Sequence, residues 1–348
     1  MYLVWNLRYY RSKTVLLYFY NPDEEMMKKL LLGTLVISAL FSVTATAENK
    51  TAPAYVPVEF SAKLDGNEYH FKPETSPQRI VSLSQITTEM LLALDLGDRM
   101  VGTAFLEEPI YPPVKAAYDK IPVLAEKWPS YEVFMSVKPD FATGWANSFS
   151  KLALEANKIV PEGVAVYVPE SMTSPKADVN TYFNDMLKFG EIFGVQETAE
   201  KYVAAEKEKL NTVISQIQAY PEKTAFIFDS QDGKPYTFFD GYTSEMLKLI
   251  SVKNIFAGKN TGKTWAVGNW EDVIMSDPEV IIIPVYKGFR NDDDYDQKVA
   301  FIESMPEMQG VKAVKNKNYI KVNLSELVPG PRSIDILPVL AKEIHEKP

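Results

Sequence analysis

A regular alternation of short apolar runs with helix-like stretches constrains the fold of this chain more than any other feature. It begins at Arg79, where RIVSLS is followed by TTEMLLALDLG and then by MVGTAF. The outer two runs are short and apolar, as buried strands are, and the middle run has the spacing of a helix that closes at Gly97. The pattern therefore predicts an α/β fold with a mainly parallel sheet covered by helices.

The alternation continues along the chain and then repeats. PDFATGW and VAVYVP are predicted as further strands of the first half, and a helix is predicted over residues 179–193. Beyond Pro221 the predicted order is the strand TAFIFDS, the helix SEMLKLI, the strand VIIIPVY, the helix VAFIESM, the strand NYIKVNL and the helix SIDILPVLAKEI. Ahead of both halves, residues 56–71 alternate around Asp65-Gly66-Asn67, which predicts a β-hairpin packed on the outside of the first half.

The stretch between the two halves, residues 197–220, predicts one long amphipathic helix. Its apolar residues recur at three- and four-residue steps, and neither Pro nor Gly interrupts it. At about 1.5 Å per residue this helix would span roughly 36 Å, close to the width of a domain. We therefore expect two α/β domains of similar plan, joined by this helix. Ligands of open α/β sheets bind beyond the carboxyl ends of the strands, so the two domains should enclose a cleft.

The beginning of the chain predicts export. From Met26 or Met27, two lysines precede an apolar run over residues 30–43 and the small-residue site Ala45-Thr46-Ala47. The run is shorter than the roughly 20 residues needed to cross a bilayer, so we expect a signal peptide cleaved after Ala47 and not a membrane anchor. Residues 1–25 would bury the basic start of this signal, and we interpret them as an upstream extension with translation beginning at Met26 or Met27.

These patterns divide the chain into six predicted segments. They are an upstream extension at 1–25, a signal peptide at 26–47, a hairpin segment at 48–78, a first α/β lobe at 79–195, a linking helix at 196–220 and a second α/β lobe at 221–348.

Composition narrows the classes of function. The formal net charge of −9 provides no basic field to attract nucleic acid. The chain has no cysteine, which excludes disulfides and a lipid-modified cysteine and predicts a free periplasmic protein. Its two histidines, His70 and His345, are too few for a bare zinc, manganese or redox metal site or for a histidine-assisted nucleophile. We therefore predict no catalytic residue, no metal site and no cofactor, although carboxylate-only chemistry stays open.

Five motifs in a fixed order resemble the class III periplasmic substrate-binding proteins of ABC transporters. They are RIVSLS with TTEMLLALDLGDRMVGTA, then KWPSYEVFMSVKPDFATGW, KNIF, NWEDVIMSDPEVIII and LVPGPRSIDIL, and the resemblance spans Arg79 to Ile344. Members of this family deliver ferric siderophores, cobalamin or haem. The resemblance implies two Rossmann-like lobes bridged by a rigid helix, a monomer that closes little on its ligand, and no chemistry performed on that ligand.

The resemblance also implies a partner. Glu132 in PSYEVFM and Glu271 in NWEDVIM match the glutamates that, in this family, dock onto arginines of the membrane permease dimer, one from each lobe. Two carboxylates at fixed separation on a rigid body suit this task, because charge complementarity gives register and steering more than raw affinity.

Candidate ligand contacts are aromatic, polar and cationic residues on loops near strand ends. Aromatic rings suit a bulky, partly planar ligand, and arginines suit an anionic chelate. Arg332 in the GPR motif is the strongest candidate, because family members often place a cleft-facing arginine there. The full set is Trp128, Trp145, Asn147, Phe149, Phe239, Tyr242, Trp265, Tyr286, Arg290 and Arg332.

Two further motifs carry less weight. GKNTGKT at residues 258–264 has too few residues between its glycines for a phosphate-binding P-loop, and we assign it to a surface loop. Asp292, Asp294, Asp296 and Glu303 have the spacing of a calcium-binding EF-hand, but Gln297 stands where its sharp turn requires glycine.

The sequence thus favours a periplasmic binding protein that captures a ferric siderophore or similar metal chelate for an ABC importer. Within the class, the alternative is a cobalamin or haem carrier. From other classes, a two-lobed envelope enzyme or a sensor that presents its ligand to a membrane receptor stays open.

Overall fold

The strands of the first half form one parallel sheet. The computed structural model describes residues 55–217, 219–259, 262–286 and 294–347. The five strands follow the order β5-β4-β3-β6-β7, and each neighbouring pair is parallel. The strands are β3 (Ile80–Ser82), β4 (Met100–Ala104), β5 (Val123–Ala125), β6 (Phe141–Thr143) and β7 (Ala165–Tyr167). We refer to this sheet and the helices that cover it as the first lobe.

The second half forms another parallel sheet, in the order β11-β8-β13-β14. Its strands are β8 (Lys223–Ile227), β11 (Val252–Asn254), β13 (Val280–Val285) and β14 (Tyr319–Asn323). We refer to this sheet and its helices as the second lobe. The predicted α/β class with parallel sheets is confirmed, whereas the segment boundaries drawn from the sequence stay predictions.

Most predicted helices are present. They are α2 (Gln85–Ala93), α6 (Val179–Phe193), α7 (Gln196–Gln216), α8 (Tyr242–Lys248), α10 (Tyr295–Ser304) and α13 (Leu337–His345). The structure also has α4 (Tyr131–Ser136) and α9 (Trp270–Ser276). Four further helices are single turns: α3 (Lys115–Tyr118), α5 (Ala156–Ile159), α11 (Lys312–Lys315) and α12 (Leu324–Leu327). The last helix was predicted to begin at Ser333. It begins at Leu337, because Pro338 fits the first turn of a helix but not its interior.

The predicted hairpin is confirmed and lies on the first lobe. It consists of β1 (Phe60–Leu64) and β2 (Asn67–Phe71), paired antiparallel. At its turn Asp65 and Gly66 both have positive φ, 49° and 83°, as the tightest hairpin turns require. The ring of Phe60 lies 6.3 Å from that of Phe141 on β6, which fixes the hairpin against the first sheet.

The second lobe also carries a small antiparallel sheet that the sequence analysis did not predict. Its order is β12-β10-β9, with β9 (Ser230–Asp232), β10 (Lys234–Phe238) and β12 (Trp265–Val267). These strands are too short to show a period, and β10 pairs with a strand that is distant in the sequence. The sheet follows directly after β8, so it adds a second wall at the carboxyl end of that strand.

One short helix in each lobe is built in the same way. Ser130 caps α4 by accepting a hydrogen bond from the backbone of Val133, and Asn269 caps α9 by accepting one from Asp272. In both helices the second residue is a glutamate, Glu132 or Glu271, and its side chain is exposed. The equivalent local structure explains why both glutamates occupy matching places on their lobes.

The same correspondence continues into the sheets. Each helix is followed by a residue with positive φ, Lys138 or Asp277, and then by a proline. An acidic residue comes next. Asp140 accepts a hydrogen bond from the backbone N–H of Arg79 at 2.9 Å, and Glu279 accepts one from Thr224 at 2.9 Å, at the starts of the central strands β3 and β8. The two lobes therefore share the same local structure, in which a capped helix is followed by an acidic residue that binds the start of a central strand.

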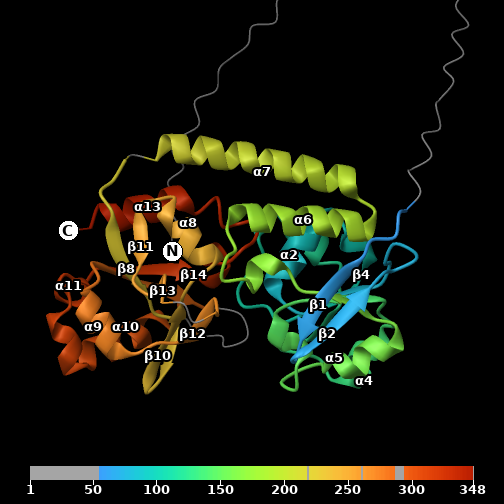
Figure 1. Cartoon of the computed structure of the whole chain (residues 1–348), viewed down its shortest axis with the longest axis horizontal. Coiled ribbons are helices and arrows are strands. Elements are labelled where there is room, and N and C mark those ends of the chain that lie inside the picture. Colours follow the sequence, from blue (N-terminus) through green and yellow to red (C-terminus); the bar gives the residue numbers. More distant parts are fainter. Residues whose placement is uncertain (1–54, 218, 260–261, 287–293, 348) are drawn as a thin grey trace, which may run out of the picture. The chain divides into compact units, whose positions relative to one another are not determined.

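The long helix α7 contacts both lobes. It packs along α6 of the first lobe and also contacts α13 of the second lobe (Figure 1). It ends at Gln216, so the predicted end at Tyr220 was too late, because a residue before proline avoids the helical region. Its role as a rigid strut between the lobes stays a prediction.

A single hydrophobic cluster runs through both lobes. It includes Phe189 and Ile192 of α6, Tyr242 of α8 and Leu340 of α13. The rings of Tyr182 and Tyr242 lie 6.2 Å apart where α6 meets α8. A continuous core opposes independent motion of the lobes. None of the described helices is long and apolar enough to span a membrane.

The close approach of α6 and α7 depends on Gly190. A Cβ atom at this position would lie 2.5 Å from the Cβ of Ala199, so we expect Gly190→Ala to lower the free energy of unfolding by about 1–3 kcal/mol. Adding Ala199→Gly should restore much of the loss. Gly310→Ala is the matched control, because a Cβ there meets no atom within 4 Å. Urea unfolding checks this, and equal effects of the two single substitutions would contradict the packing.

Candidate ligand cleft

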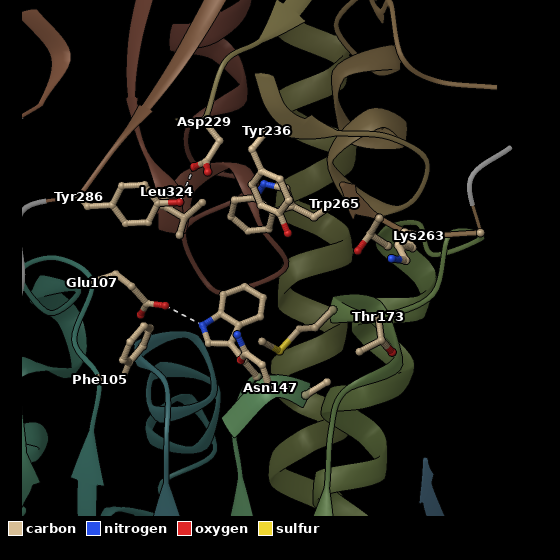
Figure 2. Close-up of a pocket in the computed structure, with 15 residues that line it drawn as sticks. Phe105, Glu107, Asn147, Thr173, Asp229, Tyr236, Lys263, Trp265, Tyr286 and Leu324 are labelled. Atoms are coloured by element: carbon tan, nitrogen blue, oxygen red, sulfur yellow. Dashed lines mark hydrogen bonds between the residues drawn. The ribbon is translucent and has the colours of Figure 1, made fainter. Parts of the chain in front are cut away.

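A cavity of about 460 Å³ opens between the carboxyl ends of the two parallel sheets. Its first-lobe wall comes from loops that follow strands: Phe105, Glu107, Trp145, Ala146, Asn147, Met172 and Thr173. Its second-lobe wall comes from loops and from the small antiparallel sheet: Asp229, Tyr236, Gly262, Lys263, Thr264, Trp265, Tyr286 and Leu324. Figure 2 shows these side chains converging on the same space. The volume falls within the roughly 300–1,000 Å³ of small-molecule sites.

The second-lobe wall is a stack of aromatic rings. Trp265 on β12 stacks on Phe238 of β10 with ring centroids 4.3 Å apart, and on Tyr236 with centroids 5.9 Å apart. Trp145 of the first lobe meets Trp265 edge to face at 6.3 Å. Among the described residues, the indole nitrogen of Trp265 is buried and has no hydrogen-bond partner. The wall thus offers flat apolar surface and an unused donor.

Phe105 supplies aromatic surface on the opposite side and has an unusual backbone. Its φ is 62°, which a bulky side chain seldom adopts and which occurs mainly at functional sites. Its backbone carbonyl accepts a hydrogen bond from Gln85 at the start of α2. The ring stacks on Trp128 at 4.9 Å with an interplanar angle of 4°. Trp128 therefore supports Phe105 and is not itself among the lining residues.

Glu107 places a buried carboxyl group in the first-lobe wall. The residue is 2% exposed, and its Oε1 accepts a hydrogen bond from Trp145 Nε1 at 2.6 Å. The backbone of Gln85 donates to its other oxygen at 3.2 Å. Burial raises the pKa of Glu107 to about 8, because removal from water disfavours the charged form more than these hydrogen bonds favour it.

Asp229 places a second buried carboxyl group in the opposite wall, just after β8. The residue is 5% exposed, and it accepts hydrogen bonds from the hydroxyls of Tyr286 and Ser230. Burial raises the pKa of Asp229, while the Tyr286 hydrogen bond and the charge of Lys298 oppose the rise. Lys298 also donates to the carbonyl of Pro284 at 2.7 Å.

Arg332, the strongest sequence candidate for ligand binding, is not among the residues that line the cavity. Its guanidinium forms a two-pronged ion pair with Glu89 on α2 and approaches Glu108 at 3.4 Å. It also donates to the carbonyl of Pro109 at 2.7 Å. All these partners belong to the first lobe, and the Arg332 side chain is only 11% exposed. The structure therefore places this arginine in a link between the lobes.

The other predicted contacts divide into two groups. Trp145, Asn147, Trp265 and Tyr286 line the cavity, and their contact with a ligand stays a prediction. Phe149, Phe239 and Tyr242 are instead buried in hydrophobic clusters. Arg290 lies outside the described residues, as does Asp292 of the EF-hand-like run.

Sequence reasoning missed Phe105, Glu107, Tyr236 and Asp229. Their positions just after strands could have identified three of them, because Phe105 and Glu107 follow β4 and Asp229 follows β8. The candidates were restricted mainly to aromatic and cationic types, so carboxylates at strand ends were passed over. The loop of GKNTGKT, assigned to the surface, is exposed at Lys263 but also lines the cavity.

Comparisons with known proteins agree with this architecture. The family model described as periplasmic binding protein matches residues 80–323. A crystal structure of a periplasmic binding protein from Veillonella parvula is 51% identical, covers 83% of this chain and 98% of its own, and has a TM-score of 0.77. The uncharacterized ABC transporter substrate-binding lipoprotein YvrC of Bacillus subtilis is 27% identical over 77% of this chain and 80% of its own. The vitamin B12-binding protein of Photorhabdus laumondii is 25% identical over 60% of this chain and 71% of its own.

We expect the loss of Arg332 to act mainly by destabilising the fold and not by removing a direct contact with the ligand. Arg332→Ala leaves Glu89 and Glu108 buried without their cation, so we expect the free energy of unfolding to fall by about 3–5 kcal/mol. Lys201→Ala is the control, because the Lys201–Glu197 ion pair is 74% and 83% exposed and should contribute below about 1 kcal/mol. Denaturant unfolding measures both. Unchanged stability with lost ligand affinity would return Arg332 to the ligand site.

The Glu107 carboxyl should make stability depend on pH. Between its ordinary value of 4.5 and the folded-state pKa of about 8, the folded protein holds a proton that the unfolded chain releases. The free energy of unfolding should therefore fall as pH rises through this window, by up to about 1.4 kcal/mol per unit. Glu107→Gln should remove this part of the slope, and Glu162→Gln, at an exposed position, should not. Thermal melting from pH 5 to 9 checks this; an unchanged slope in Glu107→Gln would contradict it.

Proposed function

Because the chain belongs to the periplasmic binding protein family, we propose that it captures a ferric siderophore or similar metal chelate and delivers it to the permease of an ABC importer. The observation that carries the proposal is the aromatic cavity between the carboxyl ends of two parallel sheets. A site in this place can hold a ligand between two rigid walls and release it without chemical change.

The form of the cavity supports a bulky chelate. Trp145, Trp265 and Tyr236 supply ring surface for stacking and apolar contact. The alternative is a corrinoid, because one of the relatives is named a vitamin B12-binding protein, and a corrin ring would use the same aromatic surfaces.

Transport accounts for the site better than catalysis does. The two buried carboxyl groups, Glu107 and Asp229, each accept hydrogen bonds from an aromatic residue of their own lobe. Their partners hold them in place, whereas carboxylate-only catalysis needs groups directed at a reacting bond. We therefore propose a binding protein without enzymatic activity.

The family and the composition support an extracytoplasmic compartment. Members act outside the cytoplasm, and the signal-like segment at 26–47 lies outside the described residues. YvrC is named a lipoprotein, but this chain has no cysteine to carry a lipid. We propose a free periplasmic monomer that meets its permease by diffusion.

Delivery would use Glu132 and Glu271. Both are exposed second residues of capped helices, one on each lobe, so their separation is set by the packing of the lobes. The N-terminal turn of each helix favours a charged carboxylate, and backbone hydrogen bonding lowers the pKa of Glu132. Both side chains would face arginines of the permease.

Reversing both charges tests delivery apart from capture. We expect Glu132→Arg with Glu271→Arg to abolish chelate-dependent uptake while the dissociation constant of the purified protein changes less than about threefold, because neither residue lines the cavity. Glu162→Arg with Asp232→Arg, also exposed and one in each lobe, is the matched control. Uptake is measured in cells that depend on the chelate for iron. Normal uptake by the doubly reversed protein would contradict docking through these glutamates.

A further inference from the structure

We propose that the cleft selects chelates that carry no net negative charge, because buried carboxyl groups from both lobes face it. This inference rests on the proposed function, since it assumes that the ligand is a metal chelate. It narrows the ligand class to cationic or uncharged chelates and excludes polyanionic ones. Figure 2 shows Glu107 and Asp229 reaching the cavity from opposite sides, with Tyr286 beside Asp229.

The carboxyl groups are fixed parts of the walls. Glu107 is held by Trp145 and by the backbone of Gln85, and Asp229 by Tyr286 and Ser230. Both residues are more than nine-tenths buried, so neither can turn out to solvent without breaking these hydrogen bonds. A ligand in the cavity therefore meets them in a medium where charges are weakly screened.

Among the described residues, the cations near the cleft do not offset this arrangement. Arg332 is paired with Glu89 and Glu108. Lys298 is bonded to the carbonyl of Pro284 and paired with Asp294 at 3.1 Å. Among the described lining residues, Lys263 is the only lysine or arginine, and it lies on an exposed loop.

An anionic chelate would meet unfavourable electrostatics in this cleft. At a pH above about 8, where Glu107 is ionised, it would leave water and approach Glu107 on one wall and Asp229 on the other, with Lys263 the only lysine or arginine among the described lining residues. A cationic chelate regains charge-assisted hydrogen bonds from the same groups, and an uncharged chelate can donate N–H or O–H groups to them. Specificity would thus come from repulsion of the wrong ligand as well as attraction of the right one.

Proton binding by Glu107 should also make the affinity for a cationic chelate depend on pH. Its pKa of about 8 reflects burial and the neighbouring charge of Glu108. Burial and Asp229 raise the pKa of Tyr286, and Glu107 adds to this rise. A bound cation stabilises the ionised carboxylate and releases its proton. Affinity for a cation should therefore increase as pH rises through about 8.

Tryptophan fluorescence of the purified protein provides the test, since Trp145 and Trp265 line the cavity. The probes are ferrioxamine B as a cationic ferric hydroxamate, ferrichrome and cyanocobalamin as uncharged chelates, and ferric enterobactin as a trianionic catecholate. At a pH above the Glu107 pKa of about 8, we expect the best cationic or uncharged probe to bind at least about a hundredfold more tightly than the trianion, the effect of two charge-assisted contacts.

Two isosteric variants locate the effect. Glu107→Gln and Asp229→Asn keep an acceptor oxygen for Trp145 and Tyr286 and remove the charge. Each should weaken ferrioxamine B by about tenfold, change the uncharged probes by less than about threefold and strengthen ferric enterobactin. Glu107→Gln should also remove the rise in ferrioxamine affinity with pH. The exposed Glu162→Gln and Asp232→Asn are matched controls and should change none of these values.

The outcomes separate the two proposals. If chelates bind but the trianion is held as tightly as the cation, or the variants leave the order of affinities unchanged, the charge selection is wrong and the proposed function stands. If no probe of any charge binds, the proposed function fails and the charge selection fails with it.

Discussion

The buried link between Arg332 and Glu89 is the interaction on which the geometry of the cleft depends. It joins the loop after α12 of the second lobe to α2 of the first. Glu108 of the first lobe also accepts a hydrogen bond from the backbone N–H of Ser325 on α12 at 2.8 Å. Such ion pairs add little net stability when complete but are costly to break, because a lone buried charge is left behind. Together with the hydrophobic cluster shared by both lobes, this link favours one fixed arrangement over a hinge.

If the two lobes are held in one arrangement, the equivalent helices and strand starts that they share are also held at fixed positions relative to one another. Capped helices α4 and α9 carry Glu132 and Glu271, and the acidic residues that follow them, Asp140 and Glu279, anchor the starts of the central strands. The strand ends that would hold the ligand and the helix ends that would meet the permease are therefore parts of the same framework. If the lobes moved freely, two docking carboxylates could not keep the separation that simultaneous contact requires.

Local patterns in the sequence were sufficient for the framework but not for the site. The helix at 179–193 and the turn at Asp65-Gly66 were predicted correctly, because periodicity and turn chemistry are properties of neighbouring residues. The pairing of β10 with β12 and the ion pair of Arg332 with Glu89 join residues far apart in the chain, and no local pattern encodes them. The family resemblance suggested a cleft-facing role for Arg332, whereas its partners in this chain are acidic residues of the other lobe.

The carboxyl groups of the cleft would let the binding site select its ligand by charge without a change of fold. The aromatic residues Trp145 and Trp265 suit many chelates, since stacking is insensitive to net charge. Glu107 and Asp229 are sensitive to it, and each is fixed by a hydrogen bond from an aromatic residue of its own lobe. The rings would hold a ligand by shape while the carboxyl groups select by charge. Because the scaffold sets only where strand ends meet, two side chains at those ends are enough to change which chelate is retained.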